Sequence, residues 1–443
     1  MKRPLTISFL ITLLAATFAA AQYPSFDTAS RGEGEMEMVF MAGEVPVAEP
    51  EAMAIGTAPD PSAAREWLVL VFISGVNDLG ILNFASDDVN EMEQVGSTDN
   101  VAVVAEYNIL SVDAADRSLQ FQRGAKTLYV QRDADPAITS PVIHESNDLD
   151  MGSWRHLVKF ARRNIMRFPA KKVLLVVWNH GSGTLGIAND DVSGNKISVR
   201  DLGRALSQIK AAKGGKIDVL ATDACLMQMA GVAYELKDHA EVVVGSEEII
   251  AGPGYPYHTM LAAINADPGM DAAGMGRALV SRYDAAYPRS GSTLSALRTD
   301  RLGGFVRRLD AWTSAVMADP AAMRAAASDG VINGTFYFRM PDSKDLGDYI
   351  DIVSDSLPAD SPAVAAGAAL KEYIKNDLLL AAEAGTGTHR IEGAAWPYTG
   401  RTHGLAVYIP FRIYDSATYE SLAFAADSRW DDFLRALMAE RLK

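Results

Sequence analysis

The sequence is poor in cysteine and in positive charge, and each shortage excludes a class of protein. Cys225 is the one cysteine in 443 residues, so the chain cannot form an intramolecular disulfide or supply the thiolates of a zinc or iron–sulfur cluster. Lys and Arg number 41 against 56 Asp and Glu, which gives a formal net charge of −15. This balance repels nucleic acid and anionic membrane surfaces and favours cationic ligands. We therefore expect no nucleic-acid partner.

Several motifs that bind metals or phosphates are also missing. The sequence has no His-Glu-x-x-His, and Gly181-Ser182-Gly183 lacks the Lys-Ser/Thr ending of a phosphate loop. The acidic segment 87–91 is typical of a solvated helix face, with a cation site as the alternative. The composition, 49% hydrophobic and 22% charged, is that of a water-soluble globular protein.

The N-terminal residues have the pattern of an export signal. Lys2 and Arg3 precede a nearly continuous apolar run, residues 5–18, and small residues follow at 19–21. The run is shorter than the ~20 residues that cross a bilayer, so residues 1–21 predict a cleaved signal peptide rather than a membrane anchor. We expect a secreted or periplasmic protein without a membrane span. Residues 22–65 are rich in Ala, Pro and Glu and predict an acidic flexible leader or pro-segment.

Strand-like and helix-like segments alternate between residues 66 and 270. Continuous apolar runs, typical of strands buried on both faces of a sheet, lie at 67–74, 101–107, 172–178, 217–221 and 241–244. Segments with helical spacing lie between them, at 87–95, 151–168, 201–211 and 226–236. This alternation predicts an α/β domain over residues 66–270, with a mainly parallel sheet flanked by helices.

The pattern changes in the C-terminal part of the chain. Helical spacing dominates there, at 275–287, 302–317, 346–356, 361–384 and 430–442. The one clear late strand is the run 404–410. We therefore predict a mostly helical C-terminal domain over residues 271–443 that contributes a late strand.

Two of the predicted strands end at residues that can do chemistry. Strand 173–178 leads into His180 on a glycine-rich turn, and strand 217–221 leads into Cys225. The carboxyl ends of parallel strands lie at one edge of a sheet, and the separation of 45 positions between the two is enough for one right-handed crossover. We therefore expect a dyad of base and nucleophile. Taken singly, a capping histidine and an inert core thiol are the alternatives.

The expected surroundings of Cys225 suit acyl transfer. A thiol at the start of helix 226–236 and beside a histidine should have a lowered pKa. Backbone N–H groups at that helix start and after His180 can hold a developing oxyanion, and Gly181 permits close approach. Asp223 lies two residues before Cys225 and shares its face in an extended chain. Its carboxylate either attracts a substrate Lys or Arg or caps the helix, and the spacing favours neither.

These motifs, in this order, resemble the clostripain family of cysteine peptidases, whose fold is caspase-like. They cover nearly everything from about residue 67 to residue 437. The matching blocks are Asn77-Asp78-Leu79, Asn179-His180-Gly181, Asp223-Ala224-Cys225-Leu226-Met227, Val244-Gly245-Ser246-Glu247-Glu248, Gly252-Pro253-Gly254-Tyr255-Pro256-Tyr257, Asp345-Leu346-Gly347-Asp348 and His403-Gly404-Leu405-Ala406-Val407-Tyr408.

The resemblance implies a role for each matched site residue. His180 would be the catalytic histidine and Cys225 the nucleophile that forms the acyl-enzyme. Gly181 and Cys225 would supply the N–H groups of the oxyanion hole, and Asp223 would bind the Arg or Lys before the cleaved bond. The further implied residues, which would line the pocket wall, are Ser246 and Glu247.

The resemblance also implies processing. Family members are made as precursors, cleave themselves between the histidine and the cysteine, and in some cases need calcium. Lys196, in the polar loop 189–198, is the natural internal cleavage candidate, with an ordinary solvated lysine as the alternative. Gly231 stands where several relatives have an acidic residue, and Ser182 where glycine is common. These departures leave fine specificity and calcium dependence open, and the chemistry itself requires no cofactor.

The sequence as a whole predicts a secreted cysteine endopeptidase that cleaves peptide bonds after Arg or Lys. The expected mechanism uses a Cys-His dyad and a thioester acyl-enzyme, and we expect a monomer acting on protein or peptide substrates. The alternative is a catalytically silent caspase-like surface or binding protein, because a fold does not guarantee its usual activity.

Overall fold

The computed structural model describes residues 65–112, 119–121, 124–146, 150–391 and 394–443. These residues all belong to one compact unit, Thr57–Lys443. The expected signal peptide lies outside the described residues, and so does the expected leader except for Arg65, which is the first residue of strand β1. Along the described chain, no helix combines the length and the apolar character needed to span a bilayer.

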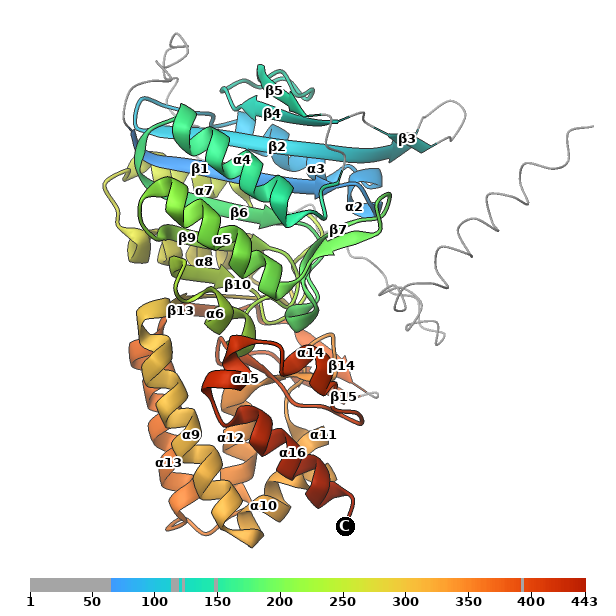
Figure 1. The fold of residues 1–443 in the computed structure, drawn as a ribbon, viewed down its shortest axis with the longest axis vertical. Coiled ribbons are helices and arrows are strands. Elements are labelled where there is room, and N and C mark those ends of the chain that lie inside the picture. Colours follow the sequence, from blue (N-terminus) through green and yellow to red (C-terminus); the bar gives the residue numbers. More distant parts are fainter. Residues whose placement is uncertain (1–64, 113–118, 122–123, 147–149, 392–393) are drawn as a thin grey trace, which may run out of the picture. The chain divides into compact units, whose positions relative to one another are not determined.

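The centre of the unit is a sheet whose middle strands are parallel (Figure 1). Strands β2, β1, β6, β9 and β10 lie side by side in that order and run in the same direction. Antiparallel strands extend both edges: β4 and β5 beyond β2, and β11 and β13 beyond β10. The predicted sheet is thus confirmed. The bounds are β1 Arg65–Gly75, β2 Val101–Val112, β3 Leu119–Phe121, β4 Ala125–Tyr129, β5 Val142–Ser146, β6 Ala170–Trp178, β9 Ile217–Asp223, β10 Ala240–Gly245, β11 Thr293–Arg298 and β13 Leu379–Ala384.

Strand β1 shows why the apolar runs become central strands. Successive side chains of a strand point to opposite faces. Leu68, Leu70 and Phe72 enter the core on one face of the sheet, and Val69 and Val71 enter the core on the other. Burial of each such side chain stabilises the fold by about 1.5–3 kcal/mol, so an uninterrupted apolar run is most stable in the middle of the sheet.

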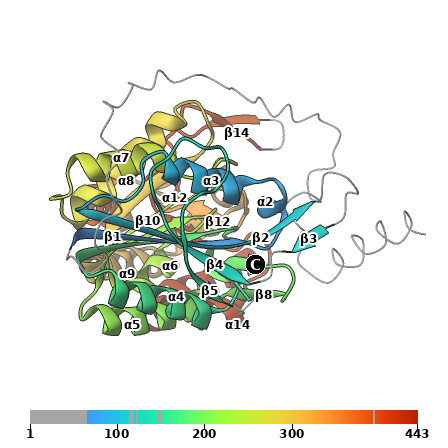
Figure 2. The same cartoon turned by 90° about the horizontal axis from the view of Figure 1, so that it is seen from above.

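Helices cover both faces of the sheet, as predicted (Figure 2). The helices on one face are α4 Trp154–Arg167, α5 Val199–Lys213 and α6 Ala230–Leu236, and those on the other are α3 Phe84–Glu93, α7 Tyr257–Ala266 and α8 Ala272–Ala286. In α4, Leu157, Val158 and Ala161 are buried at helical spacing, and the helix ends two residues before Pro169.

The C-terminal part is mostly helical, also as predicted. Its helices pack around an aromatic cluster in which the Trp312 ring contacts Tyr349, Trp430 and Phe433. The helices are α9 Leu302–Ala318, α10 Pro320–Ala327, α11 Asp329–Gly334, α12 Leu346–Asp355, α13 Pro362–Tyr373, α14 Ser416–Tyr419, α15 Ala423–Asp427 and α16 Trp430–Arg441. Two short hairpins complete the fold, β7 Ile187–Asp190 with β8 Asn195–Ile197, and β14 Thr388–Ile391 with β15 Ala394–Pro397.

The C-terminal part does add strands to the main sheet, but the run 404–410, which was predicted to do so, is not among them. The late run forms β16, Ala406–Tyr408, which pairs with β12, Ser343–Asp345, in a separate two-stranded sheet. Strands β11 and β13 pair at the edge of the main sheet instead. Residues 379–384 have a helical sequence because they are rich in Leu and Ala, yet the open edge of β11 offers them backbone hydrogen bonds. Tertiary pairing here overrides local propensity.

Candidate active site

The register of two central strands brings His180 and Cys225 to one edge of the sheet. Trp178 at the end of β6 pairs with Asp223 at the end of β9, and the Asn179 N–H donates to the Asp223 carbonyl at 3.2 Å. His180 and Cys225 each follow a partner of this pair by two residues. The backbones stay in contact beyond it, since a Cβ added to Gly181 would lie 2.1 Å from the Cys225 carbonyl oxygen.

An acidic residue that was not predicted holds the His180 ring. Nε2 of His180 lies 2.7 Å from Oδ1 of Asp78, the first residue of the short helix α2, Asp78–Ile81, which follows β1. Burial alone would raise the pKa of Asp78. The hydrogen bond to His180 and the imidazole charge together lower this pKa by more than burial raises it, so the net shift is downward. Nδ1 of His180 has no hydrogen-bond partner in the described part of the chain. Asp78 thus fixes the ring and leaves Nδ1 free.

Cys225 lies on a turn and not at a helix start, which corrects the predicted boundary. Helix α6 begins only at Ala230, because Leu226 has a left-handed φ of 64° and donates its N–H to the Glu248 carbonyl. Gln228 makes a similar bond to the Ser246 carbonyl. The turn is therefore paired with the segment after β10, and the thiol is too far from α6 to gain from its dipole.

The thiol pKa is raised, which contradicts the expected lowering. Burial raises the pKa of Cys225 to about 11, with a smaller contribution from the charges of Glu248 and Asp223; the Ile250 N–H, 3.4 Å from Sγ, opposes these effects. Among the described residues, no hydrogen bond joins Sγ to the His180 ring. At neutral pH the sulfur is thus a thiol, and it needs a base to become a nucleophile.

Asp223 faces the interior rather than a helix end. Its side chain is 3% exposed, and Oδ2 accepts hydrogen bonds from the Tyr255 N–H and the Tyr257 hydroxyl, each at 3.0 Å. Burial is the main cause that raises its pKa to about 7. The N-cap of α6 is Met229, so the alternative that made Asp223 a helix cap is wrong.

The backbone donors expected for an oxyanion hole are unoccupied. Among described residues, neither the Gly181 N–H nor the Cys225 N–H donates to a backbone carbonyl or to another residue's side chain. Both lie at the contact between the two turns. A place for both in an oxyanion hole stays a prediction.

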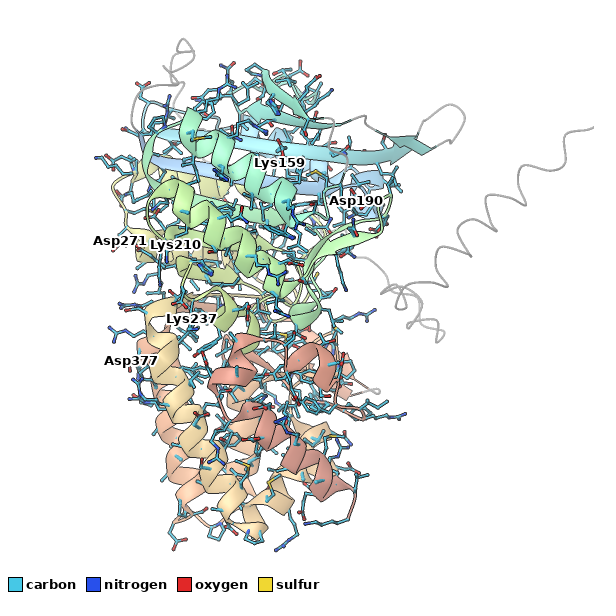
Figure 3. The ribbon with its side chains drawn as sticks, viewed as in Figure 1. Lys159, Asp190, Lys210, Lys237, Asp271 and Asp377 are labelled. Carbon is cyan, nitrogen blue, oxygen red and sulfur yellow. The ribbon has the colours of Figure 1, made fainter. Side chains whose placement is uncertain are left out.

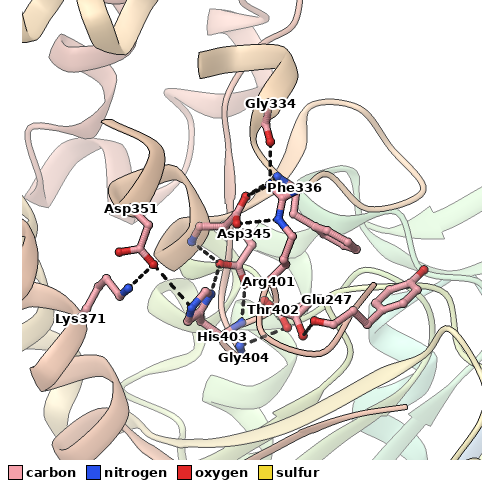
Figure 4. Close-up of polar contacts among 12 residues, drawn as sticks. Glu247, Gly334, Phe336, Asp345, Asp351, Lys371, Arg401, Thr402, His403 and Gly404 are labelled. Atoms are coloured by element: carbon pink, nitrogen blue, oxygen red, sulfur yellow. Dashed lines mark hydrogen bonds and ion pairs between the residues drawn. The ribbon is translucent and has the colours of Figure 1, made fainter. Parts of the chain in front are cut away.

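Ser246 and Glu247 are buried and bonded away from solvent. Ser246 Oγ shares a hydrogen bond with Thr293 Oγ1 at 3.1 Å, and Glu247 Oε2 accepts the Gly404 N–H at 3.2 Å. Figure 4 shows this contact within a polar cluster where Asp345 also accepts hydrogen bonds from His403. The cluster ties the end of β10 to the C-terminal part. A place for Ser246 and Glu247 in a pocket wall stays a prediction.

Lys196 is exposed on β8, in a hairpin that supports the histidine. The Ala188 N–H of β7 donates to the His180 carbonyl at 3.2 Å. Asp190, labelled beside β7 in Figure 3, accepts hydrogen bonds from the N–H groups of Val192, Ser193 and Met151 and holds the hairpin turn.

In the part of the chain that the structure describes, no group of three or more His, Cys, Asp or Glu residues is arranged to bind a metal ion.

Comparison with known proteins gives the same picture at the level of the family and the fold. The family model described as the clostripain family matches residues 71–436. Clostripain from Hathewaya histolytica is 29% identical over 151 residues. That match covers 30% of this chain and 28% of the relative, so the chain matches less than a third of that relative's length.

Two solved structures share the fold. One is a secreted C11 cysteine protease from Bacteroides thetaiotaomicron in complex with an irreversible peptide inhibitor, with a TM-score of 0.62 and 19% identity over 83% of this chain and 99% of that one. The other is an inactive zymogen C11 protease from Parabacteroides distasonis, with a TM-score of 0.61 and 17% identity over 84% of this chain and 99% of that one.

Proposed function

The chain belongs to the clostripain family of cysteine peptidases, and from this membership we propose that it is a secreted cysteine endopeptidase that cleaves after Arg or Lys. Cys225 is the nucleophile in this proposal, and His180 is its base. The observation that carries it is the register of β6 and β9, which makes Trp178 and Asp223 neighbours two residues before the base and the nucleophile. The export pattern of residues 1–21 supports secretion.

The proposed reaction begins with proton transfer. Because burial keeps the Cys225 pKa near 11, His180 must take the thiol proton as the sulfur attacks the scissile carbonyl. The Gly181 and Cys225 N–H groups then hold the oxyanion. His180 gives the proton to the leaving amine, which leaves a thioester. A water molecule, deprotonated by His180, releases the acid and restores the thiol.

Asp78 has a positioning role in this scheme. Its carboxylate, 2.7 Å from Nε2, fixes the tautomer that carries a proton on Nε2 and leaves Nδ1 as the acceptor. It also stabilises the imidazolium that forms when His180 takes the proton. Asp223 supplies the negative charge that binds the basic side chain of the substrate, in keeping with the chain's net charge of −15.

A panel of four fluorogenic peptides tests the proposal. The peptides differ only in the residue before the coumarin: Arg, Lys, citrulline or norleucine. Citrulline and norleucine retain much of the length of Arg and Lys but carry no charge. We expect hydrolysis of the first two only, measured with added calcium and with a chelator. Equal rates for Arg and citrulline would contradict the charged pocket. No hydrolysis in either condition would favour the silent binding protein.

Self-cleavage after Lys196 is the second part of the proposal. The residue is exposed on the β7–β8 hairpin. Activation of an inactive precursor would cleave the chain there. We expect N-terminal sequencing of the purified wild-type chain to find a fragment that starts at Ile197, and we expect Lys196→Gln to stay intact. Arg200→Gln, an exposed basic residue on α5, is the matched control and should still be cut. The same cut in Cys225→Ala would show that another peptidase makes it.

A further inference from the structure

Asp88 is buried, although the sequence placed it on a solvated helix face. It lies on α3 with 2% of its surface exposed, and Oδ2 accepts the Trp178 Nε1–H at 2.5 Å. Trp178 is the register partner of Asp223. Asp88 is therefore anchored to the strand end that precedes His180, next to the carboxylate expected to bind a basic side chain.

The two carboxylates converge on one point beside Gly254. A Cβ added there would lie 3.0 Å from Asp223 Oδ2 and 3.2 Å from Asp88 Oδ2, with Asp223 Oδ1 at 3.4 Å. Gly254 has a left-handed φ of 73°, which suits glycine and keeps this point free of a side chain. A side chain at position 254 would therefore press on both carboxylates, and glycine leaves Oδ2 of each within 3.2 Å of this one point.

Nothing in the described chain neutralises this pair. Within the described residues, neither carboxylate forms an ion pair with Lys, Arg or His, and Oδ1 of each accepts no hydrogen bond. The remaining groups that face them are acidic or neutral. They are Asp87 and Glu91 on α3, the Cys225 thiol, and the phenols of Tyr255, Tyr257, Tyr283 and Tyr287. His258 lies against Glu91, with Nδ1 3.1 Å from Oε2.

Two buried carboxylates without a counter-charge cannot both ionise at low cost. Burial, and then the charge of Asp223, raise the pKa of Asp88 well above its ordinary range, and burial raises that of Asp223 to about 7. When the pair holds one proton, its net charge is −1. When both carboxylates are ionised and a monovalent cation is bound, the net charge of the site is also −1. A cation can therefore replace the proton without changing the buried charge.

We propose that Asp88 and Asp223 together bind the basic side chain of the substrate, and that the entering guanidinium or ammonium group displaces one proton from the pair to solvent. This rests on the proposed function for the location of the pocket. Asp88 is then a second specificity-determining residue, supplied by a helix far from Cys225 in the sequence. Cation binding weakens as the pH falls. At a pH below the pKa of the carboxyl pair, the protons bound to the pair must leave before a cation can bind.

Agmatine, which is arginine without its carboxylate, tests the pair in the full-length Cys225→Ala chain. Calorimetry in buffers of different ionisation enthalpy gives the number of protons released. We expect about one proton per agmatine at pH 8, where Asp223, with a pKa of about 7, is ionised and the pair holds the single proton of Asp88. Asp88→Asn should bind agmatine roughly 10- to 100-fold more weakly at pH 8, and the two proteins should converge near pH 5.5. In Asp88→Asn the one remaining carboxyl, Asp223, is already mostly ionised at pH 8, so proton release at that pH should fall well below one.

Controls separate the pair from a general charge or folding effect. Asp87→Asn removes an exposed carboxylate from the same helix and should change agmatine binding less than twofold. Asparagine retains an oxygen that can accept the Trp178 Nε1–H, and a melting curve checks the fold. If Asp88→Asn does not fold, proton release at pH 8 by the Asp88-containing chain still decides the question, because Asp223 has almost no proton to lose at that pH.

Each outcome has a separate meaning. No proton release at pH 8, or unchanged affinity in folded Asp88→Asn, overturns the pair. Hydrolysis after Arg with no effect of Asp88→Asn keeps the proposed peptidase and removes only the second carboxylate. Agmatine binding with proton release, in a protein that hydrolyses none of the four peptides, keeps the cation site and removes the peptidase.

Discussion

Replacement of Cys225 by Ala is expected to lower kcat/KM for the Arg peptide by at least about 10⁴-fold, because the variant has no thiol with which to form an acyl-enzyme. Cys225 is the only cysteine of the chain, so no second thiol can replace it. The variant leaves His180, Asp78 and the two N–H donors in place. Initial rates of coumarin release measure the loss. Agmatine binding at the wild-type affinity would show that the pocket is intact.

The partners of the sulfur give a graded series for the same prediction. His180→Gln removes the base and should cost nearly as much as loss of the thiol. Asp78→Asn should cost less, because it leaves the base in place and disturbs only its positioning. Alkylation by iodoacetamide separates the roles further. In His180→Gln the reaction rate should rise tenfold per pH unit toward the thiol pKa of about 11, whereas the wild-type thiol should react at neutral pH. Wild-type rates of hydrolysis in Cys225→Ala would overturn the assignment of the nucleophile.

The parts of the fold that the sequence predicted correctly are those in which burial decides the structure. β1 and β6 are uninterrupted apolar runs, and only the middle of a sheet buries both faces of such a run. The edge strands carry weaker patterns. Residues 379–384 are partly exposed and their composition suits a helix, so pairing with β11 decides their conformation. Such a contact between distant segments is not visible in a local window of sequence.

The same distinction applies to the site. His180 and Cys225 each follow a buried strand, and Asp223 ends one. The same rule could also have found Asp78, which follows β1 by three residues. The start of α6 could not be found, because Leu226 is held by a hydrogen bond to the Glu248 carbonyl. That boundary error affects only the helix-dipole part of the expected lowering; burial, which the sequence did not show, is the main cause that raises the thiol pKa.

Asp88 shows a further limit of sequence reasoning. Acidic residues at helical spacing usually face solvent, and only the packing of α3 against Trp178 and the loop around Gly254 puts this carboxylate inside. A buried acid also has no local signature that distinguishes it from an exposed one. Packing between segments far apart in the sequence is therefore what converts an ordinary surface pattern into a candidate pocket.

Asp223→Asn is expected to remove the preference for basic residues while sparing the thiol. Truncation of one member of a buried, hydrogen-bonded charge pair costs about 2–5 kcal/mol, which corresponds to a fall of roughly 30- to 4,000-fold in kcat/KM for the Arg and Lys peptides. The citrulline peptide carries no charge and should lose little. Because asparagine does not ionise, the rise of activity through the Asp223 pKa of about 7 should also disappear from the pH profile.

The control for this prediction is a carboxylate at the other end of the same strand. Asp218 on β9 is 8% exposed and accepts the Val173 N–H, so Asp218→Asn also removes a buried charge from β9, but away from Cys225. It should leave the ratio of Arg to citrulline hydrolysis unchanged. Iodoacetamide should react with Cys225 in both variants at similar rates. An unchanged Arg preference in Asp223→Asn, with Cys225 still reactive, would place the basic pocket elsewhere, because asparagine keeps the size of the side chain and lacks its negative charge.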